Sequence, residues 1–171
     1  MSMAEWKGSE SVSHLLRTDE HWMSRALSLA DQAASQDEVP VGAVVVADGR
    51  EIGAAFNAPI SGCDPTAHAE VRALRDAAAR TGNYRLSGAT LYVTIEPCTM
   101  CAGALVHARI SRLVYGAPEP KAGAVSSADR LLERESLNWE VAVTGGILES
   151  RCRSRMTQFF ASRREARRTS R

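Results

Sequence analysis

The stretch Thr90–Cys101 reads TLYVTIEPCTMC and changes its pattern abruptly at Pro97. Residues 90–95 alternate in polarity and are rich in β-branched and aromatic side chains, which predicts a strand. Because proline is favoured at the first position of a helix, we expect a helix from Pro97 to about His107. A strand that leads directly into a helix is typical of α/β folds.

The two thiols of this stretch fall at the strand-to-helix junction. Cys98 and Cys101 are three residues apart, so they are neighbours on one helical face. Both lie in the expected first turn, where the helix dipole favours anions and helps to keep the sulfurs as thiolates. A pair of this kind is a candidate for metal binding.

The rest of the chain continues the alternation of strands and helices. Asp64-Pro65 has the form of an N-cap followed by a first-turn proline, which predicts a helix from there to about Arg80. Asp48-Gly49 is a hairpin signal between two apolar segments. The further expected strands are 41–46, 52–56, 112–116 and 141–143, and the further expected helices are 19–35 and one from residue 147 onward. Together these elements predict an α/β fold of three layers, α/β/α, with a mixed five-stranded sheet and helices on both faces.

Composition and charge limit the possible partners. The chain has 44% hydrophobic and 24% charged residues, and no apolar run approaches the roughly 18 residues of a membrane span. Four cysteines, two of them in C-x-x-C, indicate a reducing cytoplasm.

Residues 151–171 hold eight arginines and one glutamate, a net charge of +7 that leaves −6 on the first 150 residues. Such an end is typical of polyanion binding, although a solvated tail that contacts nothing has the same composition.

The organisation that we predict has three parts. Residues 1–18 show no sustained periodicity and are expected to form a mobile extension. Residues 19–160 form the globular domain, and residues 161–171 are an arginine-rich helix end or tail.

His68-Ala69-Glu70 offers a third metal ligand and a carboxyl group to complement the cysteine pair. One imidazole and two thiols are three zinc ligands, and a three-ligand site keeps its fourth position open, as catalytic sites do. A structural zinc site has no use for Glu70, which is suited to carry protons between an attacking water and a substrate. Residues two apart on a regular helix point in nearly opposite directions, so both can reach one ion only if the helix directs its N-terminus at it. The alternatives are a coincidental C-x-x-C and a structural site completed by Cys63.

Several longer stretches resemble one family. EVPVGA at 38–43, NAPI at 57–60, DPTAHAE at 64–70, NYRL at 83–86 and LYVTIEPCTMCAGA at 91–104 are similar to bacterial tRNA-specific adenosine deaminases of the cytidine and deoxycytidylate deaminase superfamily. Their H-x-E and P-C-x-x-C signature is that of zinc-dependent nucleobase deaminases. The resemblance runs from about residue 19 to 168. It implies the cytidine-deaminase fold, one Zn²⁺ per subunit, a homodimer, and conversion of the wobble adenosine of an arginine tRNA anticodon to inosine.

The resemblance also implies roles at the substrate. Asn57 is expected to contact the base or ribose, and Val41, Pro59 and Ala69 to belong to the pocket. Lys121 lies in a loop that resembles one lying against the RNA backbone, and Arg163 and Arg164 of the basic end are suited to the phosphates of the anticodon stem-loop. Two positions depart from the family pattern: Ala58 stands where arginine is frequent, and Pro118-Glu119-Pro120 replaces a segment in which aspartate is more usual.

Two rival functions share these motifs. A deaminase of small nucleobases, such as cytosine or guanine, needs the same zinc chemistry but gives the arginine-rich end no role. A noncatalytic RNA-binding zinc module needs the arginines but not Glu70. Both are distinguished from the main hypothesis by activity on tRNA.

Overall fold

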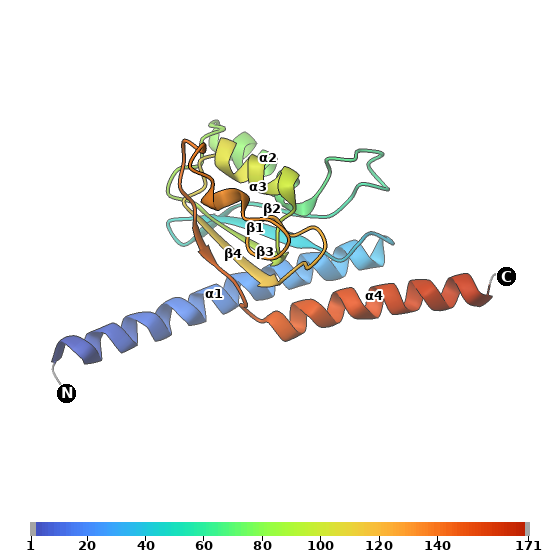
Figure 1. Cartoon of the computed structure of the whole chain (residues 1–171), viewed down its shortest axis with the longest axis horizontal. Coiled ribbons are helices and arrows are strands. Elements are labelled where there is room, and N and C mark those ends of the chain that lie inside the picture. Colours follow the sequence, from blue (N-terminus) through green and yellow to red (C-terminus); the bar gives the residue numbers. More distant parts are fainter. Residues whose placement is uncertain (1–2, 170–171) are drawn as a thin grey trace.

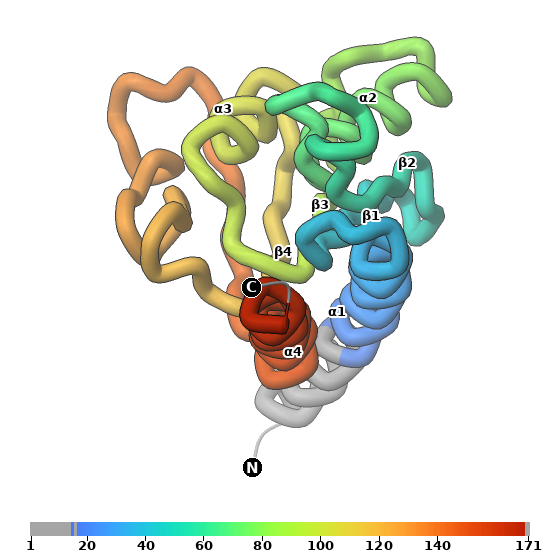
Figure 2. The backbone as a smooth tube through the Cα atoms, turned by 90° about the vertical axis from the view of Figure 1, so that its right-hand side faces the viewer, coloured from blue at the N-terminus to red at the C-terminus, as the bar shows by residue number. Residues whose placement is uncertain are grey.

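The computed structural model describes the backbone of residues 3–169 and the side chains of residues 15 and 17–169. Residues 1–2 and 170–171, the outer ends of the two predicted extensions, lie outside the described residues. The chain forms three layers, with one pair of helices above a sheet and a second pair below it (Figures 1 and 2). This is the predicted architecture.

A mixed sheet of five strands forms the middle layer. Its order is β2-β1-β3-β4-β5; β1 is antiparallel to both of its neighbours, whereas β3, β4 and β5 run parallel. Asp48 and Gly49 both have positive φ, of 49° and 71°, as a two-residue hairpin turn between β1 and β2 requires. The strands are β1 Gly42–Ala47, β2 Arg50–Phe56, β3 Thr90–Ile95, β4 Arg112–Ala117 and β5 Ala142–Thr144.

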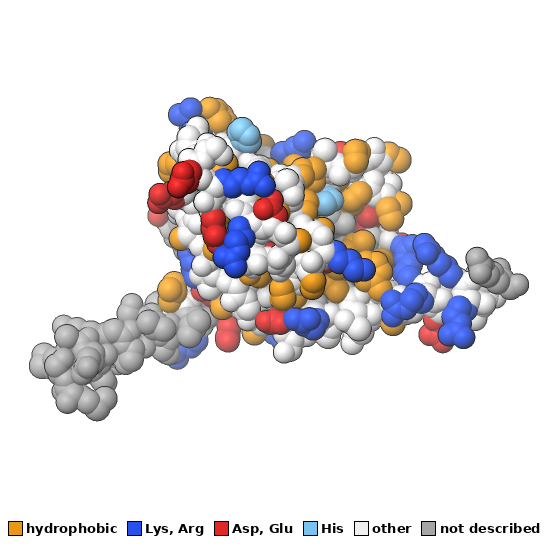
Figure 3. All heavy atoms as spheres, in the orientation of Figure 1, with side chains coloured by type: hydrophobic (Ala, Val, Ile, Leu, Met, Phe, Trp, Pro, Cys, Tyr) orange, Lys and Arg blue, Asp and Glu red, His pale blue; other side chains and the backbone are white. Residues whose placement is uncertain are grey.

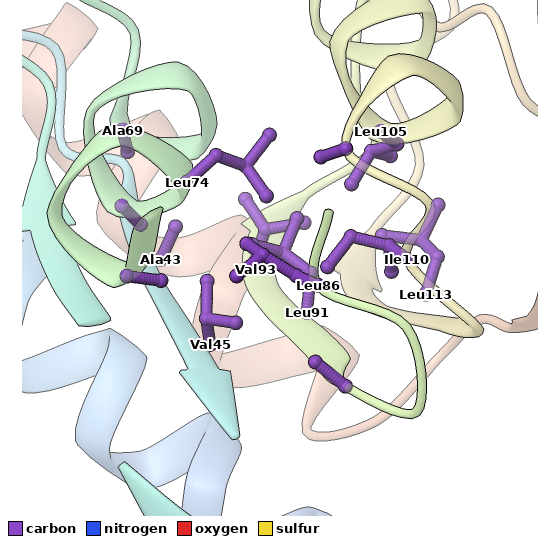
Figure 4. Packing of buried hydrophobic residues seen from close by; sticks show 14 of the residues in the cluster. Ala43, Val45, Ala69, Leu74, Leu86, Leu91, Val93, Leu105, Ile110 and Leu113 are labelled. Carbon is purple, nitrogen blue, oxygen red and sulfur yellow. The ribbon is translucent and has the colours of Figure 1, made fainter. Parts of the chain in front are cut away.

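Alternate residues of the central strands face different helices. Ala43 and Val45 pack with α2 and α3 on one face, whereas Val44 and Val46 pack with α1 and α4 on the other. Because β1 is covered on both sides, it is apolar throughout instead of alternating. Figure 4 shows the core between α2, α3 and the sheet. The helices are α1 Met3–Ser35, α2 Ala69–Thr81, α3 Thr99–His107, the 3₁₀ helix η1 Leu131–Glu133 and α4 Glu149–Thr169.

A buried ion pair joins α1 to the sheet. The Asp19 side chain is 1% exposed and accepts two hydrogen bonds from the Arg112 guanidinium, each of 2.8 Å. The hydroxyl of Tyr92 donates to the same carboxylate at 2.9 Å. The first helix is thereby fixed to β3 and β4 by polar contacts as well as by its apolar face.

Helix starts are where the structure departs from the sequence prediction. The first helix begins at Met3, so residues 3–18 are helical although they lack apolar periodicity. The second begins at Ala69 instead of Asp64, because the Asp64 carboxylate accepts hydrogen bonds from the backbone N–H and hydroxyl of Thr66 and forms a turn. The third begins at Thr99, two residues after Pro97.

Within the described residues, no helix has the combined length and apolarity that crossing a membrane would require.

Candidate metal centre

Two helix N-termini present the three candidate ligands. His68 is the N-cap of α2 and Cys98 is the N-cap of α3, and both have extended backbones. Cys101 lies in the first turn of α3 and is fully buried. Because His68 precedes its helix, the angle that a helix imposes between residues two apart does not apply to His68 and Glu70. The objection to both side chains serving one site is thereby removed.

The separations of the three ligand atoms fit a tetrahedral zinc ion. His68 Nδ1 lies 3.7 Å from Cys98 Sγ and 3.5 Å from Cys101 Sγ. Zinc bonds of ~2.3 Å to sulfur and ~2.0–2.1 Å to nitrogen, at tetrahedral angles, require nitrogen-to-sulfur separations of about 3.6 Å. All three ligand atoms lie within 4.8 Å of one another. The residues present therefore fit the ion that the sequence predicts.

No fourth protein ligand joins this group among the side chains that the structure describes. Cys63, the candidate for completing a structural site, is exposed and directs its thiol at the Ile60 carbonyl. Glu70 follows His68 in the first turn of α2 and is 3% exposed, but it is not part of the ligand group. The arrangement is that of a three-ligand site with a buried carboxyl beside it.

The titratable groups of the centre perturb one another. A hydrogen bond from the Cys101 thiol lowers the pKa of Cys98 to about 3, whereas the same contact and burial raise the pKa of Cys101. The hydrogen bond to Cys98 raises the pKa of His68, and burial raises the pKa of Glu70. One thiolate is thus already favoured, which suits a cation-binding site.

A loop of residues 119–127 lies against the cysteine side of the centre. Gly123 forms an antiparallel bridge with Cys98, and the N–H of Ala124 donates to the Pro97 carbonyl at 2.9 Å. Glu96 is 2% exposed and lies beneath this loop. Burial tends to raise the pKa of Glu96, but hydrogen bonds from the Ser127 hydroxyl and from backbone N–H groups outweigh burial and lower it.

The predicted pocket residues lie on three segments: before β1, after β2 and at the start of α2. The N–H of Ala58 donates to the Ala67 carbonyl at 3.0 Å, which holds the loop after β2 beside the residue that precedes His68. Asn57 follows β2, is buried, and its N–H donates to the Val41 carbonyl at 3.0 Å, so these two residues are neighbours. Pro59 is half-buried in the next loop. Ala69 is fully buried and belongs to the same core cluster as Val41.

The predicted RNA-contacting residues differ in their surroundings. Lys121 and Arg164 are exposed. Arg163 instead contacts the turn that follows α1, where its guanidinium lies 3.7 Å from the Asp37 carboxylate. Arg164, Arg167 and Arg168 form no ion pair with any residue that the structure describes, and basic side chains gather at the C-terminal end of α4 (Figure 3).

Two buried glutamates, Glu96 and Glu38, have no role in the sequence prediction. Glu96 holds the 119–127 loop, and Glu38 accepts hydrogen bonds from the N–H and hydroxyl of Ser61, at 2.7 and 2.9 Å, in the loop after Asn57. The sequence offers one signal for both: an acidic residue close to a buried apolar strand. Such residues are rarely buried without partners, so this position predicts a carboxylate that holds a neighbouring segment.

Comparisons with known proteins agree with this geometry. A family model described as "Cytidine and deoxycytidylate deaminase zinc-binding region" matches residues 16–117. The tRNA-specific adenosine deaminase of Haemophilus influenzae is 50% identical over 148 residues, 86% of each chain. The chain therefore belongs to the cytidine and deoxycytidylate deaminase family. Within that family, it groups by sequence with the proteins named tRNA-specific adenosine deaminase.

Two solved structures of related deaminases are similar to this chain. One, from a study of A-to-I editing by tRNA:A34 deaminases at the wobble position of transfer RNA, has a TM-score of 0.77 at 47% identity and covers 79% of this chain and 98% of that chain. The guanine deaminase of Bacillus subtilis has a TM-score of 0.57 at 41% identity and covers 58% of this chain and 64% of that chain. The fold is thus the predicted cytidine-deaminase fold.

Proposed function

We propose that this protein hydrolyses adenosine to inosine at the wobble position of a tRNA anticodon, with an arginine tRNA as its substrate. The observation that carries the proposal is the three-ligand group His68, Cys98 and Cys101 beside a buried Glu70. The similarity to tRNA-specific adenosine deaminases along 86% of the chain favours tRNA over other substrates.

In this proposal His68, Cys98 and Cys101 hold one Zn²⁺ per subunit. When bound, zinc acts as a Lewis acid that lowers the pKa of a water and makes it a nucleophile near neutral pH. Glu70 accepts the proton of the attacking water and passes it to the ring nitrogen beside C6 of adenine. Glu70 then takes the second proton from the hydroxyl that is now on C6 and gives it to the exocyclic amine, which leaves as ammonia while C6 keeps the oxygen as a carbonyl. Burial raises the pKa of Glu70, so its carboxyl accepts a proton more readily than that of an exposed glutamate.

Other residues bind and orient the RNA. Asn57 contacts the base or ribose, and Val41, Pro59 and Ala69 belong to the pocket. Lys121, Arg163 and Arg164 contact phosphates. An anticodon loop presents bases that are already unstacked, so moving one into the pocket costs a few kcal/mol at most. We further propose a homodimer in the cytoplasm.

Sequencing of total bacterial tRNA after incubation with the zinc-loaded protein tests the proposal. We expect inosine, which is read as guanosine, at the wobble position of an arginine tRNA and at no other position. Ammonia release from free guanine or cytosine, without inosine in tRNA, would favour the small-molecule deaminase. Binding of tRNA without ammonia release from any base would favour the noncatalytic module.

A further inference from the structure

The Glu96 carboxylate is buried without a cationic partner among the described residues. Its Oε1 accepts hydrogen bonds from the backbone N–H groups of Val125, Ser126 and Ser127, at 3.1, 2.7 and 2.9 Å. Its Oε2 accepts from the N–H of Glu119 at 3.0 Å and from the Ser127 hydroxyl. A buried carboxylate is costly unless it is fully hydrogen-bonded, and here both ends of the 119–127 loop supply the donors.

The loop approaches the carboxylate and the metal ligand very closely. A Cβ atom on Gly123 would lie 2.4 Å from Cδ of Glu96 and 2.6 Å from the Glu119 carbonyl oxygen, so a larger residue does not fit there. The same glycine pairs with Cys98. The loop is therefore held between Glu96 beneath it and the ligand-bearing backbone beside it.

This arrangement determines how the loop meets RNA. Successive N–H groups that converge on one point form a site for anions such as phosphate. In this protein the Glu96 carboxylate occupies that site, so the N–H groups of residues 125–127 are already used. These three N–H groups are therefore not available to a phosphate, and Lys121 is the exposed cation of the loop.

We propose that Glu96 is a positioning residue that fixes the 119–127 loop against Pro97 and Cys98 and so makes the loop a rigid wall of the substrate site. Glu96 does not contact the substrate. It sets where the Glu119–Lys121 end of the loop stands relative to the metal ligands. The substrate named here rests on the proposed function, whereas the positioning rests on the contacts alone.

Glu96→Gln separates positioning from packing. The amide has the same shape, and its oxygen keeps the three bonds to residues 125–127. Its NH₂ group faces the N–H of Glu119, and two donors cannot bond. We expect faster amide hydrogen exchange at the Glu119–Lys121 end, an unchanged zinc content, and kcat/KM on an anticodon stem-loop lowered roughly 10- to 100-fold, mainly through KM. Glu96→Asp keeps the charge and should recover part of the loss.

Asp19→Asn is the matched control, because Asp19 is an equally buried acid that bonds to Tyr92 and Arg112 and not to the 119–127 loop. It should lower stability without changing loop exchange or KM. Ser127→Ala removes only the hydrogen bond from the Ser127 hydroxyl to Glu96 and serves as the test variant if Glu96→Gln does not fold. A small increase in amide exchange of the loop and in KM is then expected. Unchanged exchange or unchanged KM in a folded variant, or loss of zinc, would overturn the proposal. If the unaltered protein makes no inosine, the proposed function fails, and the exchange and zinc measurements still decide the role of Glu96.

Discussion

At the scale of single residues, the centre depends on where His68 and Cys98 stand relative to their helices. Each precedes the first helical residue and has an extended backbone, so its side chain projects past the helix end. Glu70 and Cys101 lie within the first turns of the same helices. The sequence predicts that these four residues meet at one centre, and the structure brings the ligand atoms of His68, Cys98 and Cys101 within 4.8 Å of one another. The sequence wrongly places His68 inside a helix, because Asp64-Pro65 has the form of a helix N-terminus.

Glu70→Gln tests the role assigned to the buried carboxyl. The amide keeps the shape but cannot carry a proton, so we expect kcat to fall by roughly 10²- to 10⁴-fold. Zinc content and affinity for the stem-loop should stay close to those of the unaltered protein, because Glu70 is not in the ligand group. Metal analysis, binding measurements and single-turnover rates check this; a variant that keeps its rate would remove Glu70 from the mechanism.

At the scale of elements, the strands and the C-terminal ends of the first three helices follow directly from the sequence, whereas the helix starts do not. Strands β1, β3 and β4 are predicted within one residue at each end, because apolar and β-branched segments bounded by turn residues leave few alternatives. The Asp64 carboxylate instead forms a local turn with Thr66, a choice made by side-chain hydrogen bonds that residue preferences do not reveal. Local sequence patterns likewise do not predict the contact between Glu96 and a loop some 30 residues further along the chain.

Metal removal should loosen the contact between α2 and α3. The proposed ion joins the two helix N-termini, and a ligand that binds only the folded state adds its binding free energy to stability. We expect a chelator, or Cys98→Ala, to lower the melting temperature and abolish zinc binding. Cys63→Ala is the control and should retain both properties. Full zinc occupancy in Cys98→Ala would contradict the ligand set.

The stability that the Tyr92–Asp19 hydrogen bond contributes between β3 and α1 should depend on pH. Burial and the hydrogen bond to Asp19 raise the pKa of Tyr92. A raised pKa in the folded state means that Tyr92 adds stability below its unfolded value of about 10, which is lost as the pH rises above it. The free-energy advantage over Tyr92→Phe, about 0.5–1.5 kcal/mol near pH 8, should therefore shrink near pH 11. Denaturant unfolding at both pH values measures it, and a constant difference would contradict the assignment.

At the scale of the whole molecule, the chain combines a compact centre with a basic helix end that extends past the sheet (Figure 1). The sequence predicts the excess of positive charge near the C-terminus, but it does not predict which acidic residues the individual arginines contact. Arg155 pairs with Asp31 and Arg163 contacts Asp37, so these two arginines also hold α4 to α1. Arg164, Arg167 and Arg168 form no ion pair with any described residue.

Replacing Arg164, Arg167 and Arg168 by glutamine should weaken tRNA binding and its salt dependence together. The slope of log affinity against log salt concentration should decrease by roughly one for each arginine that contacts a phosphate. Arg80, Arg130 and Arg134 are ion-paired and lie elsewhere, so their triple replacement is a control with the same change in charge. Equal slopes in the two triple variants would assign no RNA contact to the end of α4.

The most direct test is the reaction of the zinc-loaded protein with an arginine anticodon stem-loop in ¹⁸O-labelled water, followed by mass spectrometry of the nucleosides. Hydrolysis at the proposed centre predicts inosine that contains one solvent oxygen, together with one ammonia for each adenosine lost. Glu70→Gln should give almost none. An intact wobble adenosine under these conditions, or equal product from the Glu70 variant, would contradict the account.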